Sequence, residues 1–596
     1  MPLTPIEIEI RNKLGVPSSA TQVLILEQSA HCDWDWLATF DQYYAQGADS
    51  HQPVAQTLNE AVSYIQNYVV KPPPPYVYTF CEMGYLRRYL HDNPSQVTAI
   101  KQFLPGIFNI SSGGIVSADN LLSHGEAFIR NYLIGRQWVE HALGITPSLQ
   151  MWIPDDFGHD AQLPIVLLAM GFMGAGFWRI PAEVGAPHVT YAASPNAPNG
   201  ILNASIGLDF TWQAADGSGI QAHWLSNSYG EGNLMYADQN NNITWDSTTQ
   251  GNINTLIYQN LYLSTNQPLP QPTPYLFVPV DNDFVAPYAN LPDIITAWNN
   301  CNGWGQTNNC VSNPSYTSGV YAVMATFDDF MQLVQAHTAP LSGNSPLSVY
   351  CSNPTDVTQP AFVPNPYYSG AYGSRPALKN LHYQTTRKLL FAESMQVILN
   401  YLGSVDPAGW SKTAAEYGAV VADAWDRLMP STHHDYIPGT SGVSGPQPPP
   451  IKDLVYSTEQ LPDLQKVHSD ANGILGGILG EIALTINPGQ TAGTPVAVFN
   501  PVGFGRSGIA ETALPVGGGA YQSSTLDGVT YTPVQQTGRN TLLLMADAPS
   551  IGYQCAYLSD TPPTFQLPLS LNLQDGSYVM ENQFLSATIE EWQARQ

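Results

Sequence analysis

The amino-acid sequence predicts an α/β protein built in three parts. The first part, expected over residues 1–378, alternates apolar strand-like runs with helical patterns, which is typical of a parallel sheet or barrel covered by helices. The second part, expected over residues 379–487, is mainly helical, and the third, 488–596, consists of short β-like runs separated by Gly and Pro turns. A chain of 596 residues is too long for a single core, so several folding units are expected.

In the first part, short apolar runs predict buried strands and longer periodic runs predict helices. TQVLILEQSA, SLQMWIP and YLFVPV are the strand candidates, and GEAFIRNYLIGRQWVEHAL and LPDIITAWNN have apolar residues at helical spacing. The segments near 235–275, 299–320 and 340–375 are rich in Asn, Pro, Gly and Tyr, so we expect long surface loops there.

The second and third parts differ clearly in pattern. Long helices are predicted over 383–402, 413–429 and 461–484, where apolar residues recur at helical spacing. In the third part, PVAVFNPVGF, SGIAETALP and TLLLMAD predict strands, and the last segment, ENQFLSATIEEWQARQ, predicts a strand pair that is just beginning.

The composition excludes some classes of partner. The net charge is -27 and only 11% of residues are charged, whereas nucleic acids and anionic membranes require clustered Lys and Arg. The longest apolar stretch, Leu163–Trp178, contains Pro164 and predicts a buried helix leading into a strand rather than a membrane span. Neutral sugars are compatible with this composition, and no pattern in the sequence indicates an oligomeric state.

The cellular compartment is left open by the sequence. The first residues, MPLTPIEIEIRNKLG, show no basic-then-apolar signal, while three Asn-x-Ser/Thr sites at Asn109, Asn203 and Asn242 are typical of extracytoplasmic proteins. The six cysteines match no zinc-knuckle spacing. Cys301 and Cys310 flank a short Asn/Gly-rich loop and are expected either to form a disulfide or to remain free thiols.

Acids and a histidine follow the predicted strands. His31 and Asp33 come directly after the VLIL run, and residues two apart in an extended chain point the same way, as two metal ligands must. Asp35 joins them if the strand continues. The alternative is a strand end with a hydrogen-bonded His and solvated acids.

Two further acid-rich turns follow later strands. Asp155 comes after SLQMWIP, at the place where α/β barrels carry catalytic groups, or else it is a helix N-cap. Asp283 follows YLFVPV, and the alternative there is a turn with Asx-type hydrogen bonds. Asp328 and Asp329 follow VYAVMATF, but a helix continues after them, so we expect a helix N-cap at that pair.

The loop Thr432-His433-His434-Asp435 offers two imidazoles and an acid. Imidazole is a common zinc donor, and a neighbouring acid can orient the ring or contact substrate; the alternative is an ordinary polar loop. Together the clusters supply two carboxylates, the minimum set for glycoside hydrolysis, and a mixed His/Asp set that suits Zn²⁺.

These segments together resemble the class II α-mannosidases, glycoside hydrolase family 38. That family carries an H-x-D-x-x-W motif, a later D-x-F-G-H segment, a D-F segment and an H-H-D-x-x-x-G-T loop. The matching segments are His31 to Trp36, Asp155 to His159, Asp283 with Phe284, and His433 to Thr440. ADNLLSHGEAFIR and FNPVGFGRSG also look like parts of the family, so the resemblance covers nearly the whole chain in order.

The resemblance implies a (β/α)7-type barrel catalytic domain, a three-helix bundle and an all-β sandwich region that is incomplete here. It also implies a retaining exo-α-mannosidase that removes terminal α-linked mannose from glycans with the help of Zn²⁺. The implied zinc ligands are His31, Asp33, Asp155 and His434.

The remaining roles also follow from the resemblance. Asp155 would be the nucleophile and Asp283 the general acid/base, with a pKa raised by an apolar surround. Trp36 and Phe157 would line the sugar pocket. Arg179 and Asp435 would hydrogen-bond sugar hydroxyls or the nucleophile.

This chain departs from the family pattern in a few places. Cys32, Trp34 and Asp35 stand where members often have other residues, and Asn282 stands where some have Asp. Family members usually continue with several hundred residues of β-sandwich. Two other functions therefore stay open: a zinc-dependent polysaccharide deacetylase, which would need a His-x-x-x-His pair that this sequence lacks, and a non-enzymatic glycan-binding protein using the 11% aromatic residues.

Overall fold

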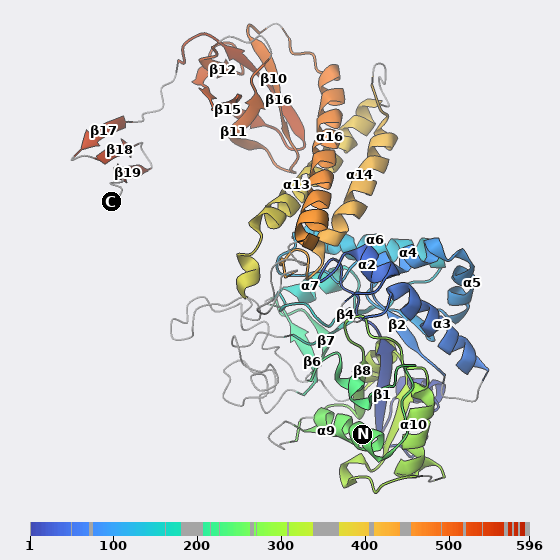
Figure 1. Ribbon diagram of the computed structural model, residues 1–596. Helices are drawn as coiled ribbons and strands as arrows, with labels where there is room; N and C mark the ends of the chain where they lie inside the picture. The colour runs from blue at the N-terminus through green and yellow to red at the C-terminus, as the bar shows by residue number, and fades with distance from the viewer. Residues whose placement is uncertain are drawn as a thin grey trace. The chain divides into compact units, whose positions relative to one another are not determined.

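The computed structural model divides into two compact units (Figure 1). One unit comprises Met1–Thr386 with Ala424–Ser469, and the other Arg387–Asp423 with Asp470–Gln596. The residues that the structure describes are 2–48, 51–70, 75–160, 162–179, 207–214, 216–225, 227–262, 268–269, 271–306, 309–337, 369–403, 410–440, 454–489, 491–515, 520–538, 540–564, 570–574, 577–581 and 585–590. The three-part division at residues 378 and 487 stays a prediction.

The first unit contains a parallel sheet in the order β3-β2-β1-β8, and β9 also pairs with β1. Its strands are β1 Gln22–Ser29, β2 Tyr78–Phe80, β3 Phe108–Ile110, β8 Tyr275–Val280 and β9 Val320–Met324. All these pairings are parallel. The strand β9 pairs with the first half of β1 and β2 with its end, so β1 is the central strand of this sheet.

A second sheet in this unit has the order β4-β5-β7-β6. Its strands are β4 Gln150–Ile153, β5 Gly174–Phe177, β6 Asp209–Gln213 and β7 Gly219–Trp224. Only the β6–β7 pairing is antiparallel. The Ser148 amide donates to the Ile110 carbonyl at 3.1 Å, so β4 follows next to the end of β3. The parallel strands and helices confirm an α/β fold, while closure into a seven-stranded barrel stays a prediction.

The strand β1 is buried on both faces, which explains its continuous apolar run. Leu24 and Leu26 pack with α9 (Ser247–Leu261) and α10 (Leu291–Asn299), whereas Val23 and Ile25 pack with α11 (Phe327–Ala336). All four side chains are fully buried. Burial of each contributes roughly 1.5–3 kcal/mol.

The helices of the first unit include several that the sequence predicts. The bounds are α1 Pro5–Lys13, α2 Phe40–Ala45, α3 Val54–Val69, α4 Met83–Asp92, α5 Pro94–Phe103, α6 Gly125–Leu143 and α7 Leu163–Ala169. Helix α6 has the predicted bounds; it ends at Gly144, whose φ of 76° is favourable for glycine. The apolar stretch 163–178 forms α7 and then β5, and none of the described helices has an apolar stretch long enough to cross a membrane.

The prediction of a long loop over 235–275 is wrong, because α9 lies within it. The Asp246 side chain accepts hydrogen bonds from the amides of Thr248 and Thr249 and so caps this helix. Its many Asn, Gln and Thr residues concealed an apolar stripe at positions 253, 256, 257 and 261, which are buried in the core. The segment 340–368 lies outside the described residues.

The predicted N-cap at Asp328 and Asp329 is displaced by two to three residues. Thr326 caps α11 with an extended backbone, and Asp329 returns a hydrogen bond to it as the other half of a capping box. The next amide, of Phe327, donates to the buried carboxyl of Glu27 on β1 at 2.8 Å. Thr79 of β2 donates to the same Glu27 oxygen, so this carboxyl links two strands to the start of α11.

The second unit contains helix segments and antiparallel strands. The long helices are α13 Pro376–Gly403, α14 Ala414–Leu428 and α16 Leu461–Thr485, and each extends into both units. The strands are β10 Thr494–Asn500, β11 Arg506–Ala513, β12 Ser523–Thr525, β13 Tyr531–Pro533, β14 Gln535–Gln536, β15 Thr541–Ala548, β16 Gly552–Ser559, β17 Ser570–Gln574, β18 Ser577–Glu581 and β19 Ser586–Glu590.

These strands form three small sheets, in the orders β10-β16-β12-β13, β11-β15-β14 and β17-β18-β19. The elements match the predicted change from helical to β pattern. A three-helix bundle and a β-sandwich as such stay predictions.

Two cysteine and glycosylation expectations are decided by local structure. Cys301 and Cys310 form a disulfide, with Cα atoms 5.4 Å apart. Asn109 is buried in β3 and its amide donates to Asp328 at 3.0 Å, so this sequon is not accessible in the folded chain. Asn242 is exposed, and Asn203 lies outside the described residues.

Candidate active site

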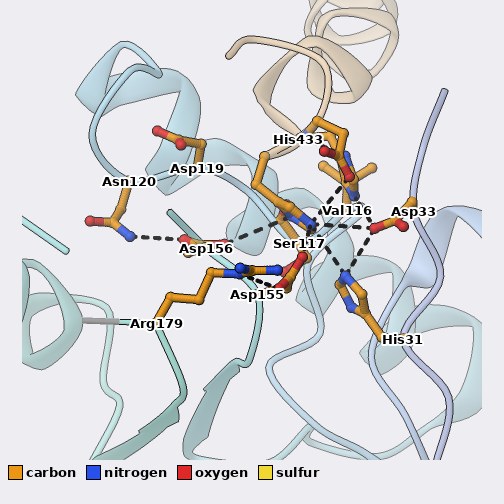
Figure 2. A network of polar contacts seen from close by, with 12 residues as sticks. His31, Asp33, Val116, Ser117, Asp119, Asn120, Asp155, Asp156, Arg179 and His433 are labelled. Carbon is orange, nitrogen blue, oxygen red and sulfur yellow. Dashed lines mark hydrogen bonds and ion pairs between the residues drawn. The ribbon is translucent and has the colours of Figure 1, made fainter. Parts of the chain in front are cut away.

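His31 and Asp33 lie just beyond the carboxyl end of β1 (Figure 2). The His31 amide donates to the Asn282 carbonyl at 3.1 Å, and the Phe284 amide donates to the His31 carbonyl at 2.7 Å. This short parallel bridge brings the segment after β1 beside the segment after β8, which carries Asp283. The His31 Nε2 atom is 2.9 Å from Asp33 Oδ1, as the spacing of two residues predicts.

His434 reaches the same point from the loop after α14. Its amide donates to the Ser117 carbonyl at 3.2 Å, and its Nδ1 lies 2.9 Å from that same oxygen. The ring therefore presents Nε2 to the site, 3.2 Å from His31 Nε2 and 3.3 Å from Asp33 Oδ1. Residues 403 positions apart in sequence thus place their ring nitrogens side by side.

Asp155 comes from the turn after β4 and completes the group. Its Oδ2 atom lies 3.7 Å from His434 Nε2, and its Oδ1 accepts a hydrogen bond from Arg179 Nε. Arg179 follows β5, and its guanidinium lies 4.4 Å from the ring centre of Trp178. Figure 2 shows His31, Asp33 and Asp155 converging on one point, with Arg179 behind the Asp155 carboxylate.

The separations within this group fit a tetrahedral metal site. Four donors about 2.0–2.1 Å from a tetrahedral zinc lie roughly 3.3 Å from one another. The four measured separations run from 2.9 to 3.7 Å. Asp33 Oδ1 receives no hydrogen bond of good geometry from the described residues, although imidazole nitrogens surround it. The donor set therefore fits a metal cation.

Groups behind the imidazoles orient them. Glu82 Oε1 lies 3.3 Å from His31 Nδ1, and the Ser117 carbonyl holds the corresponding nitrogen of His434. Such partners of metal-binding histidines fix the tautomer and direct the other nitrogen to the metal. The sequence analysis missed Glu82, although it shows the signal used elsewhere, an acid directly after a buried strand.

His433 faces away from this role. Its Nε2 contacts the Trp34 amide at 3.3 Å and its Nδ1 contacts the Asp435 amide at 3.0 Å, so both ring nitrogens are occupied by the backbone. Asp435 Oδ2 is 3.5 Å from His434 Nε2, and its Oδ1 accepts a hydrogen bond from Thr440. A second buried group of possible ligands is Asp33, His433, His434 and Asp435.

The buried charges strongly perturb one another. Burial alone would lower the pKa of His31, but the carboxylates of Asp33 and Glu82 outweigh it and hold that pKa well above its usual value. Burial would raise the pKa of Asp33, but His31 and His434 hold it well below the usual value. Burial and the neighbouring Asp33 raise the pKa of Asp435. A site with this many close carboxylates favours a bound cation.

Asp283 has a different environment from Asp155. Tyr229 Oη donates to Asp283 Oδ1 at 2.6 Å. Burial, followed by repulsion from Asp33 and Asp155, raises the pKa of Asp283 to about 7. The expected direction of this shift is therefore observed. Tyr229 follows β7 and carries no signal in the sequence that would have identified it.

The predicted sugar-contacting residues lie at different depths. Phe157 is buried, with its ring edge-on to His434 at 5.6 Å between centres, and Arg179 lies over the same ring. Trp36 is partly exposed. Their contacts with a sugar stay predictions.

Residues 22–350, more than half of the chain, match the family model described as "Glycosyl hydrolases family 38 N-terminal domain". The chain belongs to glycosyl hydrolase family 38. All of the site except the His433–Asp435 loop falls within the matched residues.

Curated relatives in the comparison are α-mannosidases of family 38 type. Alpha-mannosidase F of Dictyostelium discoideum is 22% identical over 69% of this chain and 37% of its own length. Lysosomal alpha-mannosidase of Felis catus is 21% identical over 69% of this chain and 38% of its own length. The aligned part of this chain thus spans under two-fifths of either relative.

A solved α-mannosidase from Enterococcus faecalis V583 shares the fold. It aligns with 95% of this chain and 61% of its own, with a TM-score of 0.64 and 15% identity. Because this identity is low, the likeness to that family 38 relative shows the fold alone.

Proposed function

We propose that this site is that of a retaining exo-α-mannosidase, which removes terminal α-linked mannose from glycans. The observation that carries the proposal is the convergence of His31, Asp33, Asp155 and His434 on one buried point, beside a second carboxyl with a raised pKa. Membership of glycosyl hydrolase family 38 and α-mannosidase relatives support the same activity.

Zinc is the proposed metal, because a buried set of two imidazoles and two carboxylates at these separations suits its tetrahedral preference. When bound, it would supply positive charge that orients sugar hydroxyls and stabilises the transition state. Glu82 and the Ser117 carbonyl would keep both ring nitrogens directed at it.

Asp155 is the proposed nucleophile. Its carboxylate would attack the anomeric carbon and form a covalent glycosyl-enzyme, as retaining glycosidases do. The hydrogen bond from Arg179 to Oδ1 would hold the carboxylate in place and leave Oδ2 directed at the shared point.

Asp283 is the proposed general acid and base. With a pKa of about 7 it holds a proton in mildly acidic solution and can give it to the leaving oxygen. Once deprotonated, the same carboxylate can take a proton from the water that releases the sugar. Tyr229 would keep this carboxyl in position through its 2.6 Å hydrogen bond.

The remaining residues would bind the sugar. Phe157 and Trp36 offer aromatic surfaces, and Asp435 offers a carboxylate that Thr440 holds in place. A polysaccharide deacetylase or a non-catalytic glycan-binding protein has no observation in this site that favours it over the mannosidase.

Hydrolysis of 4-nitrophenyl α-mannoside, followed by proton NMR of the freed sugar, tests the proposal. We expect α-mannose as the first product, near-complete loss of turnover in Asp155→Asn, and loss on metal stripping with recovery on adding zinc. Asp160→Asn is a matched control, because Asp160 is exposed in the loop after Asp155. Full turnover in Asp155→Asn, a β-configured first product, or release of acetate from an acetylated glycan in place of mannose would contradict it.

A further inference from the structure

A second cavity of about 560 Å³ lies away from the Asp155 site, within the first unit. Its lining includes Gln150, the first residue of β4, and Met173, which immediately precedes β5. Asp155 follows the other end of β4. The cavity therefore opens at the amino ends of strands whose carboxyl ends carry the proposed catalytic groups. Its volume is within the range of small-ligand sites, about 300–1,000 Å³.

Two buried amide side chains line this cavity with unused hydrogen-bonding capacity. Gln150 is 2% exposed and Asn109 is 5% exposed. The oxygen of Gln150 lies 3.5 Å from the Gln335 amide, but its nitrogen has no acceptor among the described residues. The nitrogen of Asn109 donates to Asp328, while its oxygen has no donor within the described part of the chain. A buried donor and a buried acceptor left without partners call for a polar ligand.

The position of the Gln150 side chain is determined by its neighbour on β5. A Cβ atom at Gly174 would come within 2.3 Å of the Gln150 oxygen, so only glycine there leaves room for this side chain. The amide is thus held in the cavity wall by packing.

The rest of the lining selects for charge and shape. Lys13 is paired with Asp329 at 2.7 Å, which leaves the carboxylate of Asp328 without a cationic partner in the cavity. An anionic ligand would therefore be repelled. Leu149 and Met173 contribute apolar surface and are 39% and 52% exposed.

We propose that this cavity binds a neutral saccharide of one or two rings, at a site separate from the Asp155 site. Sugar hydroxyls both donate and accept, so they can satisfy Gln150, Asn109 and the carboxylate of Asp328 together. The C–H faces of the ring pack against Leu149 and Met173. The site does not depend on hydrolysis, so its failure would leave the mannosidase proposal unaffected.

Methyl-selective NMR of the full chain carrying ¹³C-methyl methionine tests this proposal. The probes are methyl β-mannoside and a β-linked mannobiose, which an α-mannosidase does not consume, and glucuronate as an anionic counter-probe. The Met173 methyl signal, assigned with Met173→Leu, is expected to shift saturably with the two neutral sugars and not with glucuronate.

Two variants and one control localise the effect. Gln150→Leu removes the buried donor, and loss of such a hydrogen bond is expected to weaken binding about tenfold. Leu149→Trp fills the cavity from its exposed side and should abolish the shift even if Gln150→Leu does not fold. Gln56→Leu, at an exposed position of α3, should leave binding unchanged. No shift of Met173, an equal shift with glucuronate, or binding retained in Leu149→Trp would overturn the proposal.

Discussion

Replacing Glu27 by Gln should change how the stability of the first unit depends on pH. Glu27 is 1% exposed on β1, and one of its oxygens accepts hydrogen bonds from Thr79 and from the amide of Phe327. A glutamine side chain has nearly the same shape and keeps an oxygen for both bonds. It differs chiefly in that it cannot ionise.

The magnitude follows from the pKa of the buried carboxyl. Burial, only partly offset by hydrogen bonds from Thr79 and Phe327, raises the pKa of Glu27 from 4.5 to about 8. Between these values the unfolded chain ionises Glu27 while the folded chain keeps it protonated, so folding stability falls as pH rises. At three pH units above the unfolded pKa the loss approaches about 4 kcal/mol. Below pH 4.5 both states are protonated and this loss disappears.

Thermal unfolding of both proteins at pH 4.5, 6 and 7.5 measures the effect. The amide nitrogen that the substitution introduces adds a constant offset, because a buried donor without a partner costs about 1–3 kcal/mol. The quantity of interest is therefore the change in the difference between the two proteins, which should favour Glu27→Gln progressively with pH by several degrees in Tm. A difference in Tm that stays constant from pH 4.5 to 7.5 would refute the reasoning.

Three other perturbations have defined outcomes. Glu82→Gln should weaken zinc binding about 10- to 100-fold in competition with a chelator, because His31 loses its orienting carboxylate; unchanged affinity would exclude that role. Because Asp283 must be protonated to act as the acid, kcat/KM for an α-linked mannobiose should fall as pH rises through about 7. That limb should vanish for a dinitrophenyl mannoside, whose leaving group needs no proton, and its persistence there would assign it to another group. Replacing Cys301 and Cys310 by Ser should lower stability by about 2–3 kcal/mol, as expected for a short closed loop, and a Tm equal to that of the unaltered protein would contradict this.

Much of the chain could be predicted because its patterns are local. The run VLIL predicts β1 since both faces of that strand are buried, and the bounds of α6 follow from its apolar period and from Gly144. The positions of His31 and Asp155 after strands were visible for the same reason. Each of these signals depends only on neighbouring residues.

The missing features depend on contacts between distant segments. Helix α9 has few apolar residues, and only packing against the core shows which of its faces is buried. Tyr229 lies at the site because its hydroxyl meets Asp283, 54 positions away. The cap of α11 falls at Thr326 because the Phe327 amide is needed by Glu27 on β1. No local pattern contains this information.

The central claim is that one zinc ion is held by His31, Asp33, Asp155 and His434. A crystal structure of the zinc-loaded chain, with anomalous data collected on both sides of the zinc absorption edge, tests it most directly. The account predicts one strong peak about 2.0–2.2 Å from each of the four side chains. A peak held instead by Asp33, His433, His434 and Asp435, or no peak at this point with zinc in excess, would contradict it.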